Sequence, residues 1–313
     1  MPERTGGQPT HMWRGLLLVS LAGVIWGTIG PAVQLVHDGS GLSPLSISAY
    51  RAIAAVTVLV LVALVRGRFR RSWSLARPQW RRVIVVGLLT AAFQLLFFVA
   101  VVATGVSVAT VVCLGFAPVL LLVLEGTRRR QLPSARRMLT VGIAIVGLLL
   151  VSLTGGVENQ APNPTLGILA ALASGAAYAF STDIASPLSQ RLDILTVTVA
   201  TLSVAGAVLI PGGLALASLR GEVLTTTNGL SWLLIAYLGL VTMTVAYALL
   251  YTGLRTTPSG TAVVATLIEP VTAVLIAVLL LNEHLPPAGL VGACLIIAAI
   301  TGLGRTEGKP QPQ

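Results

Sequence analysis

Most of this 313-residue sequence consists of apolar segments that are each long enough to cross a lipid bilayer. A helix rises 1.5 Å per residue, so about 20 apolar residues cross the roughly 30 Å hydrocarbon core. Only 10% of the residues are charged, against about 25% in an average soluble domain. We therefore predict an all-α integral membrane protein with ten transmembrane helices. We place them near residues 15–36, 45–65, 83–102, 106–124, 138–153, 166–185, 194–217, 230–251, 258–281 and 288–303.

The positive charges are distributed as this order of helices requires. Of the 20 Lys and Arg residues, 18 precede the first apolar segment or follow the second, fourth, sixth, eighth or tenth. Arg220 lies on the opposite side, and Arg51 lies within the second segment. Because Lys and Arg accumulate in cytoplasmic loops, both termini are predicted to be cytoplasmic. Membrane topology accounts for the net charge of +10, so we expect the lipid bilayer as a partner and no nucleic acid.

The second half of the chain repeats the first at a shift of 152 residues. Ten of the 40 positions from Trp80 to Val119 are identical to their counterparts, where chance gives about one in ten. The shift contains five helices, an odd number, so the second copy enters the membrane from the other side. We predict two inverted five-helix repeats, residues 15–153 and 166–304, joined by a polar linker at 154–165 and followed by a disordered cytoplasmic tail at 305–313. The matched residues include Gly15 and Gly167, Gly23 and Gly175, Trp26 and Tyr178, Trp80 and Trp232, Gly87 and Gly239, and Pro118 and Pro270.

A carboxylate and a proline stand side by side in the ninth segment, at Glu269 and Pro270. A charge in mid-membrane costs about 2.5–3.5 kcal/mol, and such acids usually face a cavity or a partner. Glu269 is a candidate for binding an amino group or a proton; the alternative is a protonated side chain that ties helices together by a hydrogen bond. Pro270 and its counterpart Pro118 each delete a backbone hydrogen bond, which makes them candidate hinges or, alternatively, static kinks.

Aromatic and polar side chains inside the apolar segments are further candidates for lining a substrate cavity. Rings can contact an apolar or cationic solute, and hydroxyl or amide groups can hydrogen-bond to it; ordinary packing is the alternative for each. Arg51 is expected to extend toward the external headgroups, with a substrate carboxylate as the alternative partner. The spacing of Gly23 and Gly27 favours close approach of another helix within the bundle. The candidates for the cavity are Trp26, Thr28, Gln94, Tyr178, Tyr247, Tyr251 and Glu269.

Several short motifs resemble the EamA-domain branch of the drug/metabolite transporter superfamily. The resemblance covers about residues 16–303 as two EamA-like units. The first unit has Ala117 where the second has Glu269, and Arg130–Gln131 where the second has its terminal acid. The resemblance implies an exporter of amino acids or other small metabolites, with a central cavity between helices 1, 3, 4, 6, 8 and 9. The motifs are Trp26–Gly27, Tyr50–Arg51, Pro258–Ala262, Glu269–Pro270 and Asn282–Leu285.

Together these features predict a secondary transporter that moves a small amino-acid-like or amphipathic solute by alternating access, most simply outward. Whether a proton is coupled stays open, as does the oligomeric state, for which a monomer suffices. The alternative is an integral membrane enzyme acting on a lipid-like substrate, with a channel as a third reading. The sequence has no metal-ligand cluster, nucleophile–base set or phosphate-binding loop, so we predict no catalytic residue, metal or cofactor. Its preference for Arg over Lys favours a bacterial source, and we expect a multi-pass protein of the cell membrane.

Overall fold

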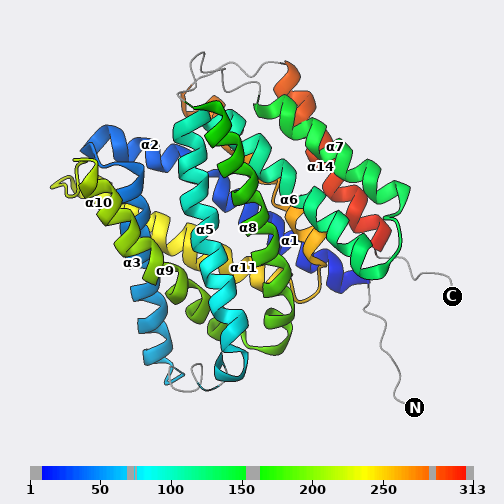
Figure 1. Cartoon of the computed structure of the whole chain (residues 1–313), viewed down its shortest axis with the longest axis horizontal. Coiled ribbons are helices and arrows are strands. Elements are labelled where there is room, and N and C mark those ends of the chain that lie inside the picture. The colour runs from blue at the N-terminus through cyan, green and yellow to red at the C-terminus, as the bar shows by residue number, and fades with distance from the viewer. Residues whose placement is uncertain (1–8, 69–73, 75, 153–162, 282–286, 308–313) are drawn as a thin grey trace.

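The computed structural model describes residues 9–68, 74, 76–152, 163–281 and 287–307. Throughout these ranges the chain is almost entirely helical, and its one strand-like pairing is an isolated bridge between Leu42 and Val223. Figure 1 shows the helices as a single bundle. The first half contains α1 (Pro9–Gly27), α2 (Ile29–Ser40), α3 (Pro44–Val65), η1 (Arg77–Gln79), α5 (Trp80–Thr104), α6 (Val106–Arg129) and α7 (Ala135–Ser152). The second half contains α8 (Pro164–Arg191), α9 (Ile194–Leu219), α10 (Gly229–Tyr237), η3 (Leu238–Val245), α11 (Ala246–Gly253), α12 (Ser259–Ala265), α13 (Ile268–Leu281) and α14 (Pro287–Glu307).

Every apolar segment predicted above coincides with helical residues. Within the described residues, nine helices are long and apolar enough to cross a membrane, and residues 287–303 form a shorter apolar helix. Large apolar side chains cover the outside of the bundle. Examples that are each more than half exposed are Leu17, Leu139, Leu169, Leu233 and Leu279. An exposed apolar surface of this extent is suited to lipid rather than to water. The chain is therefore a multi-pass membrane protein.

Short polar residues start several of the long helices. The side chain of Ser43 accepts a backbone hydrogen bond at the start of α3, and Asn163 and Asp193 do the same for α8 and α9. Pro44 and Pro164 occupy the first turns of α3 and α8, where a missing N–H costs nothing. These caps set where the helices begin, while apolar length sets how far they run. The predicted tail begins later than residue 305, because α14 continues to Glu307.

The first predicted membrane span is broken by a proline, Pro31, which the prediction of a single helix did not take into account. Pro31 has no N–H to donate to the carbonyl of Gly27, four residues earlier. Helix α1 ends at Gly27 and α2 begins at Ile29. At the break, the Thr28 N–H donates to the Ile25 carbonyl at 3.1 Å, a three-residue spacing. The span is thus two helices rather than the single one predicted.

The ninth predicted span is broken in the same way. Pro270 has no N–H for the carbonyl of Thr266, and that carbonyl instead accepts from the Glu269 N–H at 2.9 Å. Helix α12 ends at Ala265 and α13 begins at Ile268. The break places Glu269 in the first turn of α13, where the positive end of the helix dipole favours a negative charge.

Pro118 behaves differently from its counterpart Pro270. It lies inside α6, which continues without a break from Val106 to Arg129. Of the two predicted hinge positions, the structure therefore has a helix break beside Pro270 and a continuous helix at Pro118. The eighth span is also irregular, since eight residues of it, Leu238–Val245, form the π-helix η3.

Small residues bring the two broken spans into contact. A Cβ atom on Gly27 would lie 2.5 Å from the carbonyl oxygen of Glu269, and one on Gly23 would lie 3.1 Å from the Cα of Thr266. No larger side chain fits these positions without moving backbone. The close approach predicted from the spacing of Gly23 and Gly27 is confirmed, and it sets the break at Thr28 against the break before Glu269.

Long helix pairs hold the two halves of the chain together. Helix α5 packs along α8, α3 along α9, and α7 along α14, so each pair joins one helix from each half. In Figure 1, α7 and α14 form one flank of the bundle, and α3, α9 and α10 lie toward the other. Helices α1 and α8 lie between these flanks. Trp26 and Tyr178, two of the candidate cavity residues, lie on these two helices.

Candidate functional site

Aromatic side chains from four helices meet inside the bundle. Trp26 comes from α1, Phe93 from α5, Tyr178 from α8, and Tyr247 and Tyr251 from α11. The Trp26 ring centroid lies 5.3 Å from that of Tyr247 and 6.4 Å from that of Tyr178, both edge to face. Phe93 lies 5.1 Å from Tyr178, and Tyr247 lies 5.9 Å from Tyr251. Such pairs are favourable aromatic contacts, and together they form one continuous cluster.

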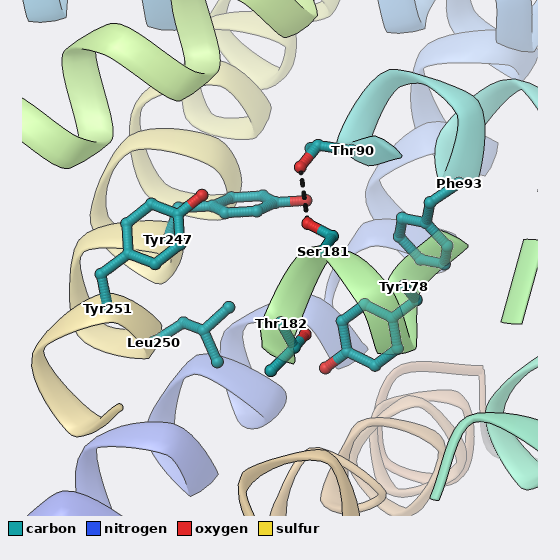
Figure 2. A pocket seen from close by; sticks show the side chains of 8 residues that line it. All are labelled: Thr90, Phe93, Tyr178, Ser181, Thr182, Tyr247, Leu250 and Tyr251. Atoms are coloured by element: carbon teal, nitrogen blue, oxygen red, sulfur yellow. Dashed lines mark hydrogen bonds between the residues drawn. The ribbon is translucent and has the colours of Figure 1, made fainter. Parts of the chain in front are cut away.

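A small cavity opens against this cluster, and we name it the aromatic cavity. Figure 2 shows its rings and hydroxyl groups pointing toward one another from α5, α8 and α11. About 10 Å³ is open to the centre of a water molecule, which is room for about one water. An organic solute needs the surrounding helices to move apart. The cavity is lined by Thr90, Phe93, Tyr178, Ser181, Thr182, Tyr247, Leu250 and Tyr251.

The indole of Trp26 is held by the π-helix of the eighth span. Its Nε1–H donates to the backbone carbonyl of Thr242 at 2.9 Å. In the π-helix η3 the backbone carbonyls accept from the N–H five residues along rather than four. Irregular turns of this kind free or redirect backbone groups and often occur at functional sites. This hydrogen bond thus joins the π-helix of the eighth span to Trp26, which belongs to the first span and to the aromatic cluster.

Hydroxyl pairs fix two of the tyrosines across helices. The Tyr178 hydroxyl lies 2.9 Å from the hydroxyl of Thr266, at the break in the ninth span. The Tyr251 hydroxyl lies 3.1 Å from that of Thr201 in α9. Tyr247 makes no hydrogen bond to another described residue, although its ring is buried. Its phenol group is therefore the one available to a molecule in the aromatic cavity.

Thr28 lies outside the lining of the aromatic cavity. Its hydroxyl donates to the Ile25 carbonyl at 2.7 Å and lies 2.7 Å from the hydroxyl of Tyr237 in α10. These contacts stabilise the turn between α1 and α2 and tie it to the eighth span. The residue is placed to hold the broken helix in its bent form rather than to touch a solute in this conformation.

Arg51 does not extend to the membrane surface, so the interpretation favoured above is wrong. Its side chain is 7% exposed, and its guanidinium donates to the Oε1 of Gln94, which is 5% exposed. Arg51 forms no ion pair with a described acid. The reason is tertiary: α3 packs against α9 and the eighth span, and this packing turns Arg51 inward.

Glu269 is partly buried at the start of α13. Its carboxylate makes no hydrogen bond or ion pair with any described residue. The predicted alternative was a hydrogen bond from Glu269 that ties two helices together. The described residues contain no such bond. No ion pair or hydrogen bond joins Glu269 to Arg51 in this conformation.

A second polar cluster is centred on Asp183, which directly follows the cavity-lining Thr182 in α8. Asp183 forms an ion pair of 2.7 Å with Arg128 at the end of α6, and it accepts from the Ser259 hydroxyl at 3.0 Å. The carboxylate thereby joins α6, α8 and α12. The Arg-rich loop after α6 is predicted to be cytoplasmic, so we expect this cluster to lie toward the cytoplasmic side.

We expect Asp183→Asn to loosen this cluster at little cost in stability. The Arg128 side chain is 59% exposed, so the ion pair is worth only about 0.2–1 kcal/mol. The reporter is a cysteine placed in the aromatic cavity, Ser181→Cys. Its labelling by a maleimide from the cytoplasmic side should become severalfold faster in the Asp183→Asn background.

The matched control for this prediction is Arg137→Met. Arg137 pairs with Glu125 at 2.7 Å, which joins α6 to α7 and leaves α8 and α12 untouched. Labelling should stay at the parent rate in this variant. Equal labelling of Asp183→Asn and its parent would show that the Asp183 cluster does not control access.

The structure thus divides the predicted cavity residues into three groups. Tyr178, Tyr247 and Tyr251 line the aromatic cavity, and Trp26 borders it through ring contacts. Gln94 and Glu269 lie beyond the lining and belong to the Arg51 region, and Thr28 stabilises a helix break. The Asn282–Leu285 motif and most of the predicted linker lie outside the described residues.

Several lining residues were not predicted from the sequence. Thr90 and Ser181 hydrogen-bond to each other at 3.1 Å, and Thr182 lies beside them. A usable signal was present, since Thr90 and Gln94 share one face of α5 and Ser181 and Thr182 lie one turn after Tyr178. Among the described residues, no three His, Cys, Asp or Glu side chains are grouped as metal ligands.

Comparison with known proteins assigns the family. The model of the EamA-like transporter family matches residues 13–153 and again residues 165–305, two segments offset by 152 residues. An uncharacterized transporter of Bacillus subtilis (strain 168), YwfM, is 29% identical over 286 residues, covering 91% of each chain. An uncharacterized inner membrane transporter of Salmonella typhimurium (strain LT2), YicL, is 23% identical over 290 residues, covering 92% of this chain and 94% of its own.

A solved structure described as "Crystal structure of protein" has the same fold, with a TM-score of 0.74 at 19% sequence identity. The match covers 93% of this chain and 98% of that one. The two family matches together span most of the sequence, and the resemblance inferred from the motifs is confirmed. The chain belongs to the EamA-like transporter family, of which it carries two units.

Proposed function

We propose that the protein is a secondary transporter that carries a small organic solute out of the bacterial cell by alternating access. The family and the two transporters to which it is similar support a role in transport. The aromatic cavity supports an amino-acid-like or amphipathic solute, because its walls combine rings with hydroxyl groups. We further propose ten spans, both termini in the cytoplasm and a location in the cell membrane.

The packing of the helices supports an inverted repeat. In such a repeat each contact has a counterpart in which every helix is replaced by the one five spans away. Helix α5 packs on α8, and correspondingly the eighth span, through α11, packs on α1. Helix α6 packs on α8, and correspondingly α13 and α12 pack on α1. The pairs α3 with α9 and α7 with α14 are their own counterparts.

The matched glycines support the same symmetry at the atomic level. A Cβ on Gly87 would lie 2.7 Å from the carbonyl oxygen of Thr201 in the seventh span. A Cβ on its counterpart Gly239 would lie 2.7 Å from the carbonyl oxygen of Arg51 in the second span. The second and seventh spans are themselves counterparts. Equivalent glycines thus serve equivalent helix crossings in the two copies.

One observation carries the proposal of alternating access. The third, fourth and sixth spans, α5, α6 and α8, are continuous helices that pack on one another. Their counterparts are the eighth, ninth and first spans, of which the eighth and the ninth both pack on the first, yet all three are broken or contain a π-helix. The two repeats thus share one sequence pattern but adopt different helix conformations around one cavity. Exchange of these shapes between the copies would move the opening from one side of the membrane to the other.

The contacts at both ends support an occluded conformation. On the side predicted to be external, the bridge between Leu42 and Val223 joins the loop before α3 to the loop before α10. The Tyr50 hydroxyl also donates to the Leu224 carbonyl at 2.7 Å. On the cytoplasmic side, the Asp183 cluster joins three helices. A solute in the aromatic cavity would be enclosed between these two closures.

The test of the proposed function is a search for solutes that leave the cell. Cells that overproduce the full chain are compared with cells that overproduce an unrelated membrane protein, and metabolites in the medium are identified by mass spectrometry. Compounds that accumulate faster are then tested for exchange across vesicles containing the purified protein. If no compound moves faster in cells or in vesicles than with the unrelated protein, the proposal is wrong.

A further inference from the structure

Arg51 and Gln94 leave buried hydrogen-bond donors without acceptors. The guanidinium donates to the Oε1 of Gln94, but Arg51 Nε and Gln94 Nε2 have no partner. Both side chains are more than nine-tenths buried. An unpaired donor in such surroundings costs about 1–3 kcal/mol, and more when it carries charge. Native proteins seldom keep this arrangement unless another group completes it.

Another part of the protein does not complete it. Glu269, the acid of the ninth span, forms no ion pair with the guanidinium, and no other described side chain accepts from the unpaired donors. Ser48, one turn before Arg51 on the same face of α3, is also buried with an unpartnered hydroxyl. Of the five buried side-chain atoms without partners among the described residues, three belong to Arg51 and its neighbours Ser48 and Gln94, and the other two belong to Glu222 and Thr257 elsewhere.

The pair is not required for building the fold. At the 152-residue shift, Arg51 corresponds to Ser203 and Gln94 corresponds to Ala246. The other copy therefore makes the equivalent crossing of helices without a cation or an amide. A buried charge that is present in one copy only is better explained by a ligand than by packing.

The location of the pair ties it to the aromatic cavity. Gln94 lies one turn from Thr90 on the same face of α5 and follows Phe93, and both of these residues line the cavity. A solute whose body lay among the rings would reach the guanidinium with one end.

We infer that Arg51 and Gln94 form a subsite for the carboxylate of the transported solute. This inference rests on the proposed function, because it assigns a part of the substrate. A guanidinium and a carboxylate are planar and match in bidentate geometry, and the Gln94 amide supplies a further N–H. One guanidinium suits a single negative charge rather than the double charge of a phosphate. Where the solute also carries an ammonium group, Glu269 and the rings attract it.

The test compares a carboxylate with its uncharged amide. The probes are 4-methylpentanoate and 4-methylpentanamide, which share an apolar body and differ in charge. Binding to the purified full chain in lipid nanodiscs is measured by equilibrium dialysis. We expect the acid to bind at least about tenfold more tightly than the amide, a difference of about 1.4 kcal/mol. L-leucine and L-leucinamide repeat the comparison for a solute that carries an ammonium group.

Variants at the pair separate the subsite from a structural role. In Arg51→Met and in Gln94→Leu, the preference for the acid over the amide should fall to less than about twofold. Arg51→Lys keeps the charge but loses the planar fork, so an intermediate preference is expected. The double variant Arg51→Met/Gln94→Leu should not lower the melting temperature, because it removes the buried charge, its unsatisfied donors and the amide that would otherwise be left unpaired. A structural role predicts the opposite, a loss of stability with the preference unchanged.

The outcomes distinguish this inference from the proposed function. Equal binding of acid and amide, binding of neither, or a preference that survives in Arg51→Met would overturn the subsite. If vesicles transport other solutes while the acid preference is absent, the subsite alone is wrong. If the acid is bound selectively but no solute crosses the membrane, the subsite stands and the proposed transport is wrong.

Discussion

A disulfide formed between Leu42→Cys and Val223→Cys should stop solute movement until it is reduced. The isolated bridge between these residues places two backbones side by side, at about the 4.8 Å separation of paired strands. This separation is within the range of Cα distances that a disulfide spans. Because external opening has to part the two loops, the oxidised protein should transport at least about 100-fold more slowly, about 2.8 kcal/mol. Solute exchange across vesicles is measured before and after addition of a reductant.

The controls for the disulfide use the same protein. Cys113 and Cys294 are first replaced by alanine so that the introduced pair is the one that reacts. Each single cysteine variant should transport equally with and without oxidant. Leu42 is fully buried, and its truncation is expected to cost about 2–5 kcal/mol, so the reduced double variant is the reference for the rate. Unchanged transport by fully cross-linked protein would show that these loops do not separate during the cycle.

Glu269→Gln should abolish accumulation of the solute against its gradient. Glu269 lies in the first turn of α13, beside the broken first span and without an ion pair. A coupled proton requires a group that gains and loses it, and an amide cannot do so. We expect uptake driven by an imposed pH difference to fall at least about 100-fold, which corresponds to about 2.8 kcal/mol. Accumulation and simple exchange are measured in the same vesicles.

The two readouts separate the two roles proposed for Glu269. If it carries a proton, exchange of solute for solute should persist in Glu269→Gln and lose its dependence on pH. If it binds an ammonium group, both readouts should weaken together, and solutes without an amino group should be unaffected. Glu125→Gln removes a carboxylate that pairs with Arg137 elsewhere, and it should leave both rates unchanged. Full activity of Glu269→Gln with the parent pH dependence would remove Glu269 from the mechanism.

The breaks in the first and ninth spans can be predicted from the local sequence, because each lies close to a proline. Pro31 and Pro270 each lack the N–H that the carbonyl four residues earlier needs, and both spans break at that carbonyl. The break near Pro31 was therefore predictable in principle. Pro118 shows the limit of the rule, because α6 passes through it without a break. Whether a proline breaks a helix or only weakens it depends on the neighbours that accept the freed carbonyl.

The π-helix and the polar pairs could not be predicted in this way. The eighth span adopts a π-helix over Leu238–Val245, while its counterpart α5 is regular. Arg51 meets Gln94 across 43 positions, and Asp183 meets Arg128 across 55. Nothing in the local sequence of Arg51 distinguishes a side chain that extends to the headgroups from one that turns inward. The packing of α3 against three other elements decides between them.

The sequence by itself determined that the chain enters a membrane, where its helices lie, that it consists of two copies, and to which family it belongs. These properties depend on apolar length and on the order of residues along the chain, which are local and additive. The tertiary structure alone decided which face of each helix turns inward, and so which residues form the aromatic cavity and the Arg51 pair. In a bilayer the outer face of a helix is as apolar as the inner one. Hydrophobic periodicity reveals the buried face of a helix in a soluble protein, but it gives almost no information about the buried face here.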